Sequence, residues 1–418
     1  MPWAFLAVTL IGAWFTFNAY LPHLRQGPMS VPSFFAGWLT SELPGHHFAW
    51  QLAATFFFVS AGALAAWPGW LGLGITLASW AGLLAMVPLA RRSEAVVEAA
   101  LAQSLGRAYR ERVAASGRTR VAPAPRGRLL LPLWLRDRAV HVVRDIRYAP
   151  GASRRHLLDV YAPKHGASGA PVLLQIHGGG WVIGDKRQQA LPLMLDLAAR
   201  GWVCVAINYR LSPKATFPDH LVDAKLAMRW IREHAAEYGG DASFLAVTGG
   251  SAGGHLTALV ALTPNDPRYQ PGFEEVDTRV QAAVPLYGVY DFTDRQKLDA
   301  GMIRFLERVV MKRRIADERD AFERASPMSL VRPDAPPFFA VHGSHDSLVP
   351  VATARLFVEL LRKVSQQPVA YAEIPFAQHA FELFHSLRTR HVVDAVGRFL
   401  DFVYEEWRAE RQGVARAG

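Results

Sequence analysis

One serine of the chain lies among glycines in a pattern that suits nucleophilic chemistry. Residues 249–253 read Gly-Gly-Ser-Ala-Gly, which fits the G-x-S-x-G motif, and they fall between an expected strand and an expected helix. In that context Ser251 is held on a sharp turn, where Gly249 and Gly253 leave room for the close approach of strand and helix. Alone the motif is weak, because glycine-rich turns before helices also bind phosphate.

A second glycine-rich loop precedes this one, at the end of another expected strand. His177 is followed by Gly178, Gly179 and Gly180, a sequence of the type whose backbone N–H groups stabilise the oxyanion of acyl transfer. Loss of one oxyanion donor typically costs roughly 10²–10³ in rate. We expect His177 to brace this loop rather than to transfer protons. A turn without a catalytic role would explain one of the two motifs, but hardly both in this order.

A serine nucleophile also needs an acid and a histidine that follow it in the chain. Asp346 comes just after the seventh expected strand, and His379 just after the eighth. Both therefore lie at C-terminal strand ends, on the sheet edge that carries Ser251 and where open α/β sheets bind ligands. The predicted chemistry is two-step acyl transfer: His379 takes the serine proton, Asp346 orients the imidazole, and water resolves the acyl-enzyme.

Other residues compete for these roles. Asp291 follows the sixth expected strand, where some relatives of this fold keep their acid, but the position of Asp346 favours the latter. Four further histidines are expected to be structural or solvent-facing: His255, His342, His345 and His385. No cluster of His, Cys and carboxylates has ligand spacing, so we expect neither a metal nor an organic cofactor.

Short β-rich runs alternate with helical stretches from about Val140 onward, which predicts a mostly parallel sheet covered on both faces. The expected strands are 142–148 and 156–161, as an opening antiparallel pair, then 172–176, 203–208, 244–247, 282–287, 338–341 and 369–374. The expected helices are 191–200, 220–238, 252–262, 352–364 and 391–408. The interval of about 292–335 is too long for a crossover, and its helical character, which includes 302–313, predicts a cap.

Four segments together resemble the hormone-sensitive-lipase-type branch of bacterial carboxylesterases and lipases, in the α/β-hydrolase superfamily. They are His177 to Trp181, Asn208 to Pro213, Gly249 to Gly254 and Gln378 to Phe381. The resemblance covers about Val140 to Trp407. It implies an α/β-hydrolase fold with Ser251 as nucleophile, a cap that also uses the segment before the first strand, and oxyanion donors at Gly179, Gly180 and Ala252.

Two departures from this family bear on substrate preference. Most members have Asp before the nucleophile, where this chain has Gly250, and the usual run of acids around Asp346 is missing. The same triad could also transfer acyl groups to an alcohol or hydrolyse amides such as formamides. A non-catalytic scaffold on the same fold is a third alternative.

The net charge of +10 is unevenly distributed along the chain. Between Arg91 and Val140 there are eleven arginines and four acidic residues, directly after a stretch from Leu43 to Ala90 without Asp, Glu, Lys or Arg. Positive charge beside a long apolar segment is typical of membrane topology, and we expect no nucleic-acid partner. The single cysteine, Cys204, lies in an apolar run and is expected to be a buried strand thiol.

Three segments of the N-terminal region have about the ~20 apolar residues of a bilayer-spanning helix. They are 3–20, 48–67 and 71–90, and a turn at Pro68-Gly69 would join the last two as a hairpin. Segment 3–20 lacks a basic n-region and a clear cleavage site, so we expect an uncleaved anchor. Arg25 and the Arg91-Arg92 pair on the same side would place the catalytic domain in the cytoplasm of a multi-pass membrane protein.

The predicted organisation therefore has three parts. Residues 1–92 form a membrane region, 93–139 an amphipathic helix and linker, and 140–418 a hydrolase domain with its cap. Apolar residues at every fourth position indicate the helix, from Ser93 to about Val113, and the Arg-, Ala- and Pro-rich segment 116–128 is the expected linker. The expected partners are a small-molecule or lipid ester and a membrane.

Overall fold

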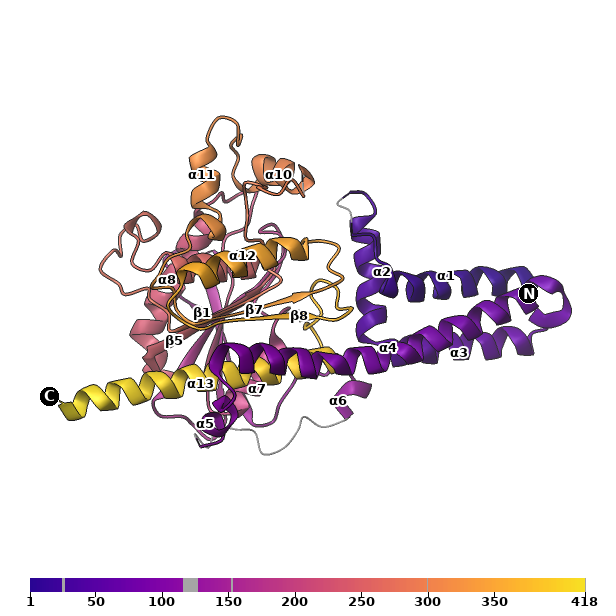
Figure 1. The fold of residues 1–418 in the computed structure, drawn as a ribbon, viewed down its shortest axis with the longest axis horizontal. Helices are drawn as coiled ribbons and strands as arrows, with labels where there is room; N and C mark the ends of the chain where they lie inside the picture. The colour runs from indigo at the N-terminus through magenta and orange to yellow at the C-terminus, as the bar shows by residue number, and fades with distance from the viewer. Residues whose placement is uncertain (25–26, 116–126, 152, 299, 418) are drawn as a thin grey trace.

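The computed structural model describes residues 1–24, 27–115, 127–151, 153–298 and 300–417. Figure 1 shows a sheet covered by helices, from which a bundle formed by the N-terminal helices projects to one side. Arg25 and residues 116–126 of the expected linker lie outside the described residues. The topology argument from Arg25 and most of the linker therefore stay sequence-based expectations.

Eight strands form one sheet in the order β1-β2-β4-β3-β5-β6-β7-β8. Their bounds are Val140–Arg147, Leu157–Pro163, Ala170–Ile176, Val203–Ile207, Gly240–Gly250, Ala282–Leu286, Phe338–Gly343 and Val369–Ile374 for β1 to β8. β2 pairs antiparallel with both β1 and β4, and the other neighbours are parallel. The predicted eight strands, with their opening antiparallel pair, are confirmed.

Helices cover both faces of this sheet. Their bounds are Leu191–Ala199 for α7, Asp219–His234 for α8, Ala252–Leu262 for α9, Val351–Val364 for α12 and Leu387–Ala417 for α13. Every residue of β3 and β4 is buried, as expected for parallel strands covered on both sides. Leu174 faces the core under α8, α9 and α12, whereas Leu173 and Cys204 face the one under α7 and α13. The sheet thus has two cores, and the thiol is buried as predicted.

The long interval after β6 contains short helices rather than one continuous helix. α10 covers Ala300–Phe305, a single π-helical turn follows at Leu306–Val310, and α11 covers Arg319–Arg324. Figure 1 shows α10 and α11 beyond α12, on the side of the domain away from α13. The helical character was predicted correctly, but its division into short pieces was not.

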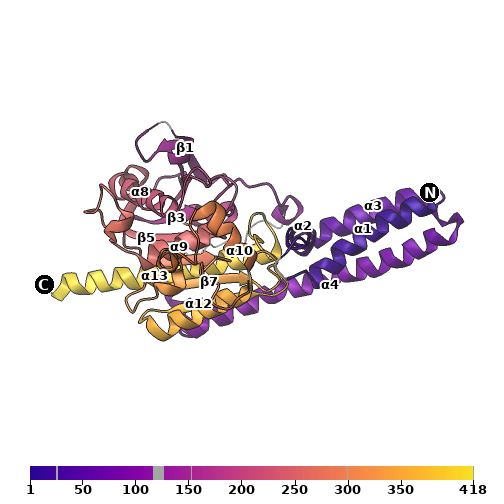
Figure 2. The same cartoon turned by 90° about the horizontal axis from the view of Figure 1, so that it is seen from above.

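Four helices form the N-terminal region. They are α1 (Pro2–Tyr20), α2 (Ser30–Glu42), α3 (Pro44–Ser60) and α4 (Trp67–Leu105). α1, α3 and α4 lie alongside one another, whereas α2 crosses them where the bundle meets the domain that contains the sheet (Figures 1 and 2). Two of these helices, α1 and α4, are long and apolar enough to cross a membrane. α3 has only 17 residues, because Gly62 with its φ of 82° lies in the turn that follows it.

The expected turn at Pro68-Gly69 is wrong, because both residues lie in the first turn of α4. Proline is favoured there, since the first helical residues have no acceptor for an N–H group. The chain turns earlier, over Ala61 to Ala66. Gly69 packs so closely on this turn that a Cβ atom would lie 1.8 Å from the carbonyl oxygen of Ala63.

α4 runs without interruption from the bundle into the domain that contains the sheet. The amphipathic helix expected to begin at Ser93 is the last third of α4, and it ends where Gly106 takes a φ of 86°. A short helix, α5, follows at Tyr109–Ala115, and α6 covers Gly127–Leu130. Val97 and Leu101 are fully buried in the core that also contains α13. The apolar face of this segment therefore packs on the enzyme, one of its two expected locations.

Candidate active site

Ser251 lies on a strained turn between β5 and α9. Its φ of 58° and ψ of −120° are rarely adopted by residues with a side chain. A Cβ atom on Gly249 would lie 2.5 Å from the carbonyl oxygen of Ile176, and one on Gly253 would lie 2.1 Å from the same atom. The two glycines therefore permit the contact with β3 that holds this turn in place.

The loop after β3 carries His177 and the three glycines. His177 stacks on Tyr209 with ring centroids 4.4 Å apart, and Tyr209 donates a hydrogen bond of 3.0 Å to the carbonyl oxygen of His177. Burial lowers the pKa of His177 to about 4, so its ring is neutral at pH 7. This buried ring therefore packs between the loop and Tyr209.

Backbone N–H groups of this loop and of the start of α9 are the expected oxyanion donors. Gly179 and Gly180 have φ values of 110° and 59°, which turn the peptide units of the loop. The N–H of Gly178 is bound by the side-chain oxygen of Gln189 at 2.6 Å. Within the described ranges, the N–H groups of Gly179, Gly180 and Ala252 donate to no protein acceptor. These three donors can therefore bind a negatively charged oxygen of a substrate.

Asp346 and His379 meet in the loops after β7 and β8. The Nδ1 atom of His379 lies 2.7 Å from Oδ2 of Asp346, and Nε2 of His342 lies 3.1 Å from the same oxygen. The other oxygen, Oδ1, accepts hydrogen bonds from the N–H groups of Leu348 and Val349 at 2.9 and 2.8 Å. Both carboxylate oxygens are thus held in a cradle of donors.

The electrostatics of this cradle favour a charged Asp346. Its complete burial would by itself raise the pKa of the carboxyl, because a low-dielectric surrounding disfavours charge. The positive charge available at His379 and the hydrogen bonds from His342 and His379 outweigh burial and hold this pKa below its ordinary value. A permanent carboxylate beside Nδ1 keeps the ring oriented and stabilises an imidazolium.

Tyr287 contacts both the turn that carries Ser251 and the ring of His379. The rings of Tyr287 and His379 have centroids 4.6 Å apart, and a Cβ atom on Gly250 would lie 2.5 Å from the Tyr287 hydroxyl oxygen. The residue before Ser251 and the ring of His379 therefore both contact one tyrosine. Among the described residues, Ser251 has no hydrogen bond to His379, as is common before substrate binds.

The competing residues have other partners. Asp291 accepts hydrogen bonds from Thr293 and Arg295. His255 is buried, bonded to the carbonyl oxygen of Ala325 at 2.8 Å and stacked on Phe292. His345 lies 3.1 Å from the carbonyl oxygen of Tyr20, and His385 is buried at the start of α13.

Two residues of the site were not singled out from the sequence, and a third was expected only to be structural or solvent-facing. His342, the third, contacts the acid, while Tyr287 and Glu382 are buried and hydrogen-bonded to each other beside His379. Burial raises the pKa of Glu382 to about 7, although the Tyr287 hydroxyl opposes this shift. Gly250 was a usable signal for this pair, because its missing side chain creates the space that Tyr287 fills.

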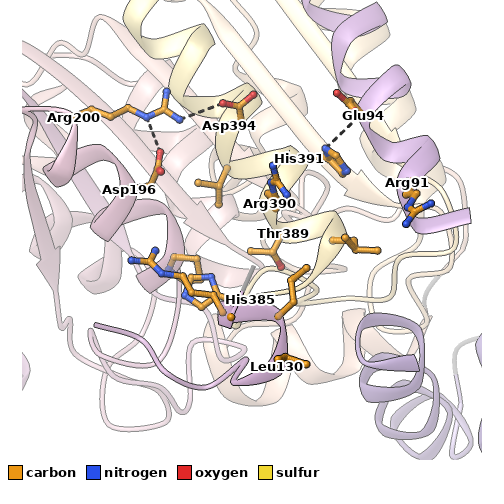
Figure 3. Close-up of a pocket in the computed structure, with 16 residues that line it drawn as sticks. Arg91, Glu94, Leu130, Asp196, Arg200, His385, Thr389, Arg390, His391 and Asp394 are labelled. Atoms are coloured by element: carbon orange, nitrogen blue, oxygen red, sulfur yellow. Dashed lines mark hydrogen bonds and ion pairs between the residues drawn. The ribbon is translucent and has the colours of Figure 1, made fainter. Parts of the chain in front are cut away.

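A pocket of about 940 Å³ lies elsewhere, where the end of α4, α6 and the start of α13 meet (Figure 3). Ion pairs cross its lining: Arg200 with Asp196 at 2.7 Å, and His391 with Glu94 at 4.0 Å. Ser251, Asp346 and His379 are not part of this lining. The pocket is therefore distinct from the candidate catalytic residues.

The sequence is similar to those of characterised and named esterases. A family model described as BD-FAE matches residues 158–361. "Probable carboxylic ester hydrolase LipM" of Mycobacterium tuberculosis is 46% identical over 414 residues, which cover 96% of this chain and 93% of LipM. "Esterase LipQ" of the same organism is 42% identical over 93% of this chain and 89% of its own. Because so little of the chain is left uncovered, these similarities include the N-terminal region as well as the catalytic part.

Solved structures show the same fold. Esterase 2 of Thermogutta terrifontis with bound propionate is 27% identical, with a TM-score of 0.52, over 63% of this chain and 94% of that one. A carbohydrate esterase from gut microbiota, at 23% identity and a TM-score of 0.55, supports the α/β-hydrolase fold alone. The chain belongs to the family of bacterial carboxylic ester hydrolases that includes LipM and LipQ, and it is a carboxylesterase that acts on ester bonds.

Proposed function

We propose that this carboxylesterase is a membrane-anchored serine hydrolase with Ser251, Asp346 and His379 as its catalytic triad. The Asp346–His379 hydrogen bond of 2.7 Å, on the sheet edge that carries the strained Ser251, is the observation that supports this most strongly. We further propose that it belongs to the hormone-sensitive-lipase-type branch, because of its oxyanion loop and the segment from Gln378 to Phe381.

Each step of the proposed reaction uses a group described above. Nε2 of His379 takes the proton of Ser251 as its Oγ attacks the ester carbonyl, while Asp346 holds the Nδ1–H in place. The N–H groups of Gly179, Gly180 and Ala252 bind the oxygen that becomes negative in the tetrahedral intermediate. The imidazolium then protonates the departing alcohol. Water, activated by the same ring, attacks the acyl-enzyme and releases the carboxylic acid.

The membrane anchor is supported by the inverted arrangement of side chains in the N-terminal bundle. Polar residues are buried between its helices, namely Thr9, Thr16, Gln51, Thr55, Thr76 and Ser79. Large apolar residues are exposed on its outside, among them Leu10, Ile11, Phe17, Phe56, Phe57, Leu77 and Leu84. An outer surface of this kind is unfavourable in water and suited to lipid.

We also propose that the hydrolase domain is cytoplasmic. Arg91 and Arg92 are exposed directly after the apolar part of α4, at the end of the bundle nearest the sheet. Flanking arginines are retained on the cytoplasmic side of a membrane helix. The proposed organisation is a membrane region over 1–92, a connecting segment over 93–139 and a hydrolase domain with its cap over 140–418.

One experiment tests anchor and triad together. Membranes from cells that express the full chain are washed with carbonate, and hydrolysis of a short p-nitrophenyl ester and labelling by a fluorophosphonate probe are measured in the pellet. We expect both to remain with the pellet, and both to be lost in a folded Ser251→Ala variant. Activity in the carbonate wash would refute the anchor, and substantial activity of Ser251→Ala would refute the triad.

A further inference from the structure

α2 contacts both loops that carry the candidate acid and histidine. At its start, the carbonyl oxygen of Ser30 accepts a hydrogen bond of 3.1 Å from the hydroxyl of Ser347, the residue next to Asp346. In its middle, the indole N–H of Trp38 donates to the carbonyl oxygen of Ala380, the residue next to His379, at 2.9 Å. The helix thus bridges two loops that are far from it in the sequence.

An aromatic contact reaches the histidine ring itself. The rings of Phe34 and His379 have centroids 6.2 Å apart in an edge-to-face arrangement. Phe34 is buried and stacks on Trp38, with centroids 5.3 Å apart and an interplanar angle of 12°. The ring that must receive and return a proton is therefore in contact with Tyr287 from the sheet and with Phe34 from the N-terminal region.

The far end of α2 is fixed by a buried ion pair. Glu42 and Arg388 lie 3.2 Å apart with no side-chain exposure, and the hydroxyl of Ser386 donates to Glu42 at 2.6 Å. Arg388 also donates to the carbonyl oxygen of Ser41 at 2.6 Å. Arg388 and Ser386 lie where the chain enters α13, so α2 is attached to the hydrolase domain at both ends and in its middle.

The position of β8 explains why such a support has an effect. β8 is the last strand of the sheet, so the loop that follows it and carries His379 has a neighbouring strand on one side only. Backbone groups of such an edge strand have hydrogen-bond partners from one neighbouring strand only. Misplacement of a catalytic group by about 1 Å can cost about 10² in rate.

We propose that Phe34 and Trp38 of α2 are positioning residues, which hold His379 and its loop in the geometry required for proton transfer. This rests on the triad proposed above. The N-terminal region then has a role in catalysis beyond any attachment to a membrane. Because the effect is on the orientation of a ring, it appears in kcat and in phosphonylation, and the KM for a small ester changes little.

The test compares neighbouring residues of the same helix in the purified full chain in detergent. Phe34→Ala removes the contact with His379, whereas Leu39→Ala truncates an exposed side chain of the same helix. Trp38→Phe keeps an aromatic ring at this position and removes the N–H donor together with one ring of the indole. For each variant we measure kcat and KM with a short p-nitrophenyl ester, the rate of fluorophosphonate labelling, and Tm.

We expect kcat and the labelling rate of Phe34→Ala to fall roughly tenfold or more, with KM within about twofold and Leu39→Ala unchanged. Trp38→Phe is expected to lower kcat about threefold, and it keeps the test decisive if Phe34→Ala does not fold. Folded variants with the kcat of Leu39→Ala would overturn the proposal. An inactive wild type, or an active Ser251→Ala, would instead overturn the triad on which it rests.

Discussion

The N-terminal bundle and the hydrolase domain differ in what they bury and what they expose. In the domain, Leu173 and Leu174 of β3 are fully buried, and in the bundle Leu77 and Leu84 of α4 are more than half exposed. The bundle buries hydroxyl groups beside apolar side chains such as Phe5 and Leu83, and Thr16 and Ser79 are hydrogen-bonded at 2.7 Å. Apolar burial is favourable only where the alternative is water. The comparison shows that the bundle carries on its outside the large apolar side chains that the domain keeps inside.

The largest expected effect comes from truncating matched leucines in the two regions. Leu174→Ala in β3 should lower the free energy of unfolding by about 2–5 kcal/mol, because it leaves a cavity in a closed core. Leu84→Ala, at a position that is 60% exposed, should change it by about 0.5 kcal/mol or less. Thermal unfolding of the purified chain in detergent measures both. Equal losses would break the comparison, since Leu84 would then belong to a packed core.

A second prediction concerns charge inside the domain. Glu382 is buried beside Tyr287, and its pKa is raised to about 7. The folded state therefore retains a proton that the unfolded chain releases near pH 4.5, so stability is present at low pH and is lost as the pH rises through about 7. Glu382→Gln removes this loss and keeps an acceptor for the tyrosine.

The measurement is the Tm of wild type and variant at pH 5 and pH 8. The advantage of Glu382→Gln over wild type should be small at pH 5 and should increase by several degrees at pH 8. Glu275→Gln, at an exposed glutamate, serves as the control and should give no such increase. A pH-independent difference between Glu382→Gln and wild type would contradict a raised pKa at this position.

The smallest effect is expected for a hydrogen bond inside the bundle. Thr16→Val keeps the shape of the side chain and removes the bond to Ser79. Hydrogen bonds between membrane helices contribute about 0.6 kcal/mol on average, and we expect a loss of this size. A double-mutant cycle with Ser79→Ala isolates the pair. A coupling energy of several kcal/mol would show that this interior penalises unpaired polar groups far more than lipid-embedded bundles do.

Local sequence patterns were sufficient to predict the sheet and the turn that carries Ser251. The alternation of short apolar strands with helices predicted all eight strands to within a few residues. A buried strand is a short run of mostly apolar residues, such as 172–176, and can be recognised as such in the sequence. The glycines around Ser251 were equally informative, since each excludes a Cβ atom for a steric reason. Hydropathy identified the apolar helices but placed the turn before α4 too late, because Pro68 is as suitable for a first helical turn as for a loop.

The contacts between distant segments could not be predicted in this way. Nothing near Phe34 or Trp38 indicates that these residues reach a loop more than three hundred residues later. The partners of Asp346 were only partly predicted, because the contact of His342 in β7 with Asp346 depends on the bend of the loop that follows this strand. Glu382 lies three residues after His379, yet its burial follows from the space that Gly250 leaves on another strand. Such features depend on packing and not on periodicity.

The continuity of α4 has a consequence for how this enzyme can reach its substrate. A helix of 39 residues is about 58 Å long, and here it is continuous from the bundle to the core of the domain, with Pro88 in its interior. A continuous helix sets the distance and the orientation of the catalytic residues relative to the bundle more closely than a flexible linker would. Pro88 lacks the N–H of one helical hydrogen bond, so it marks the point of α4 at which this orientation can change.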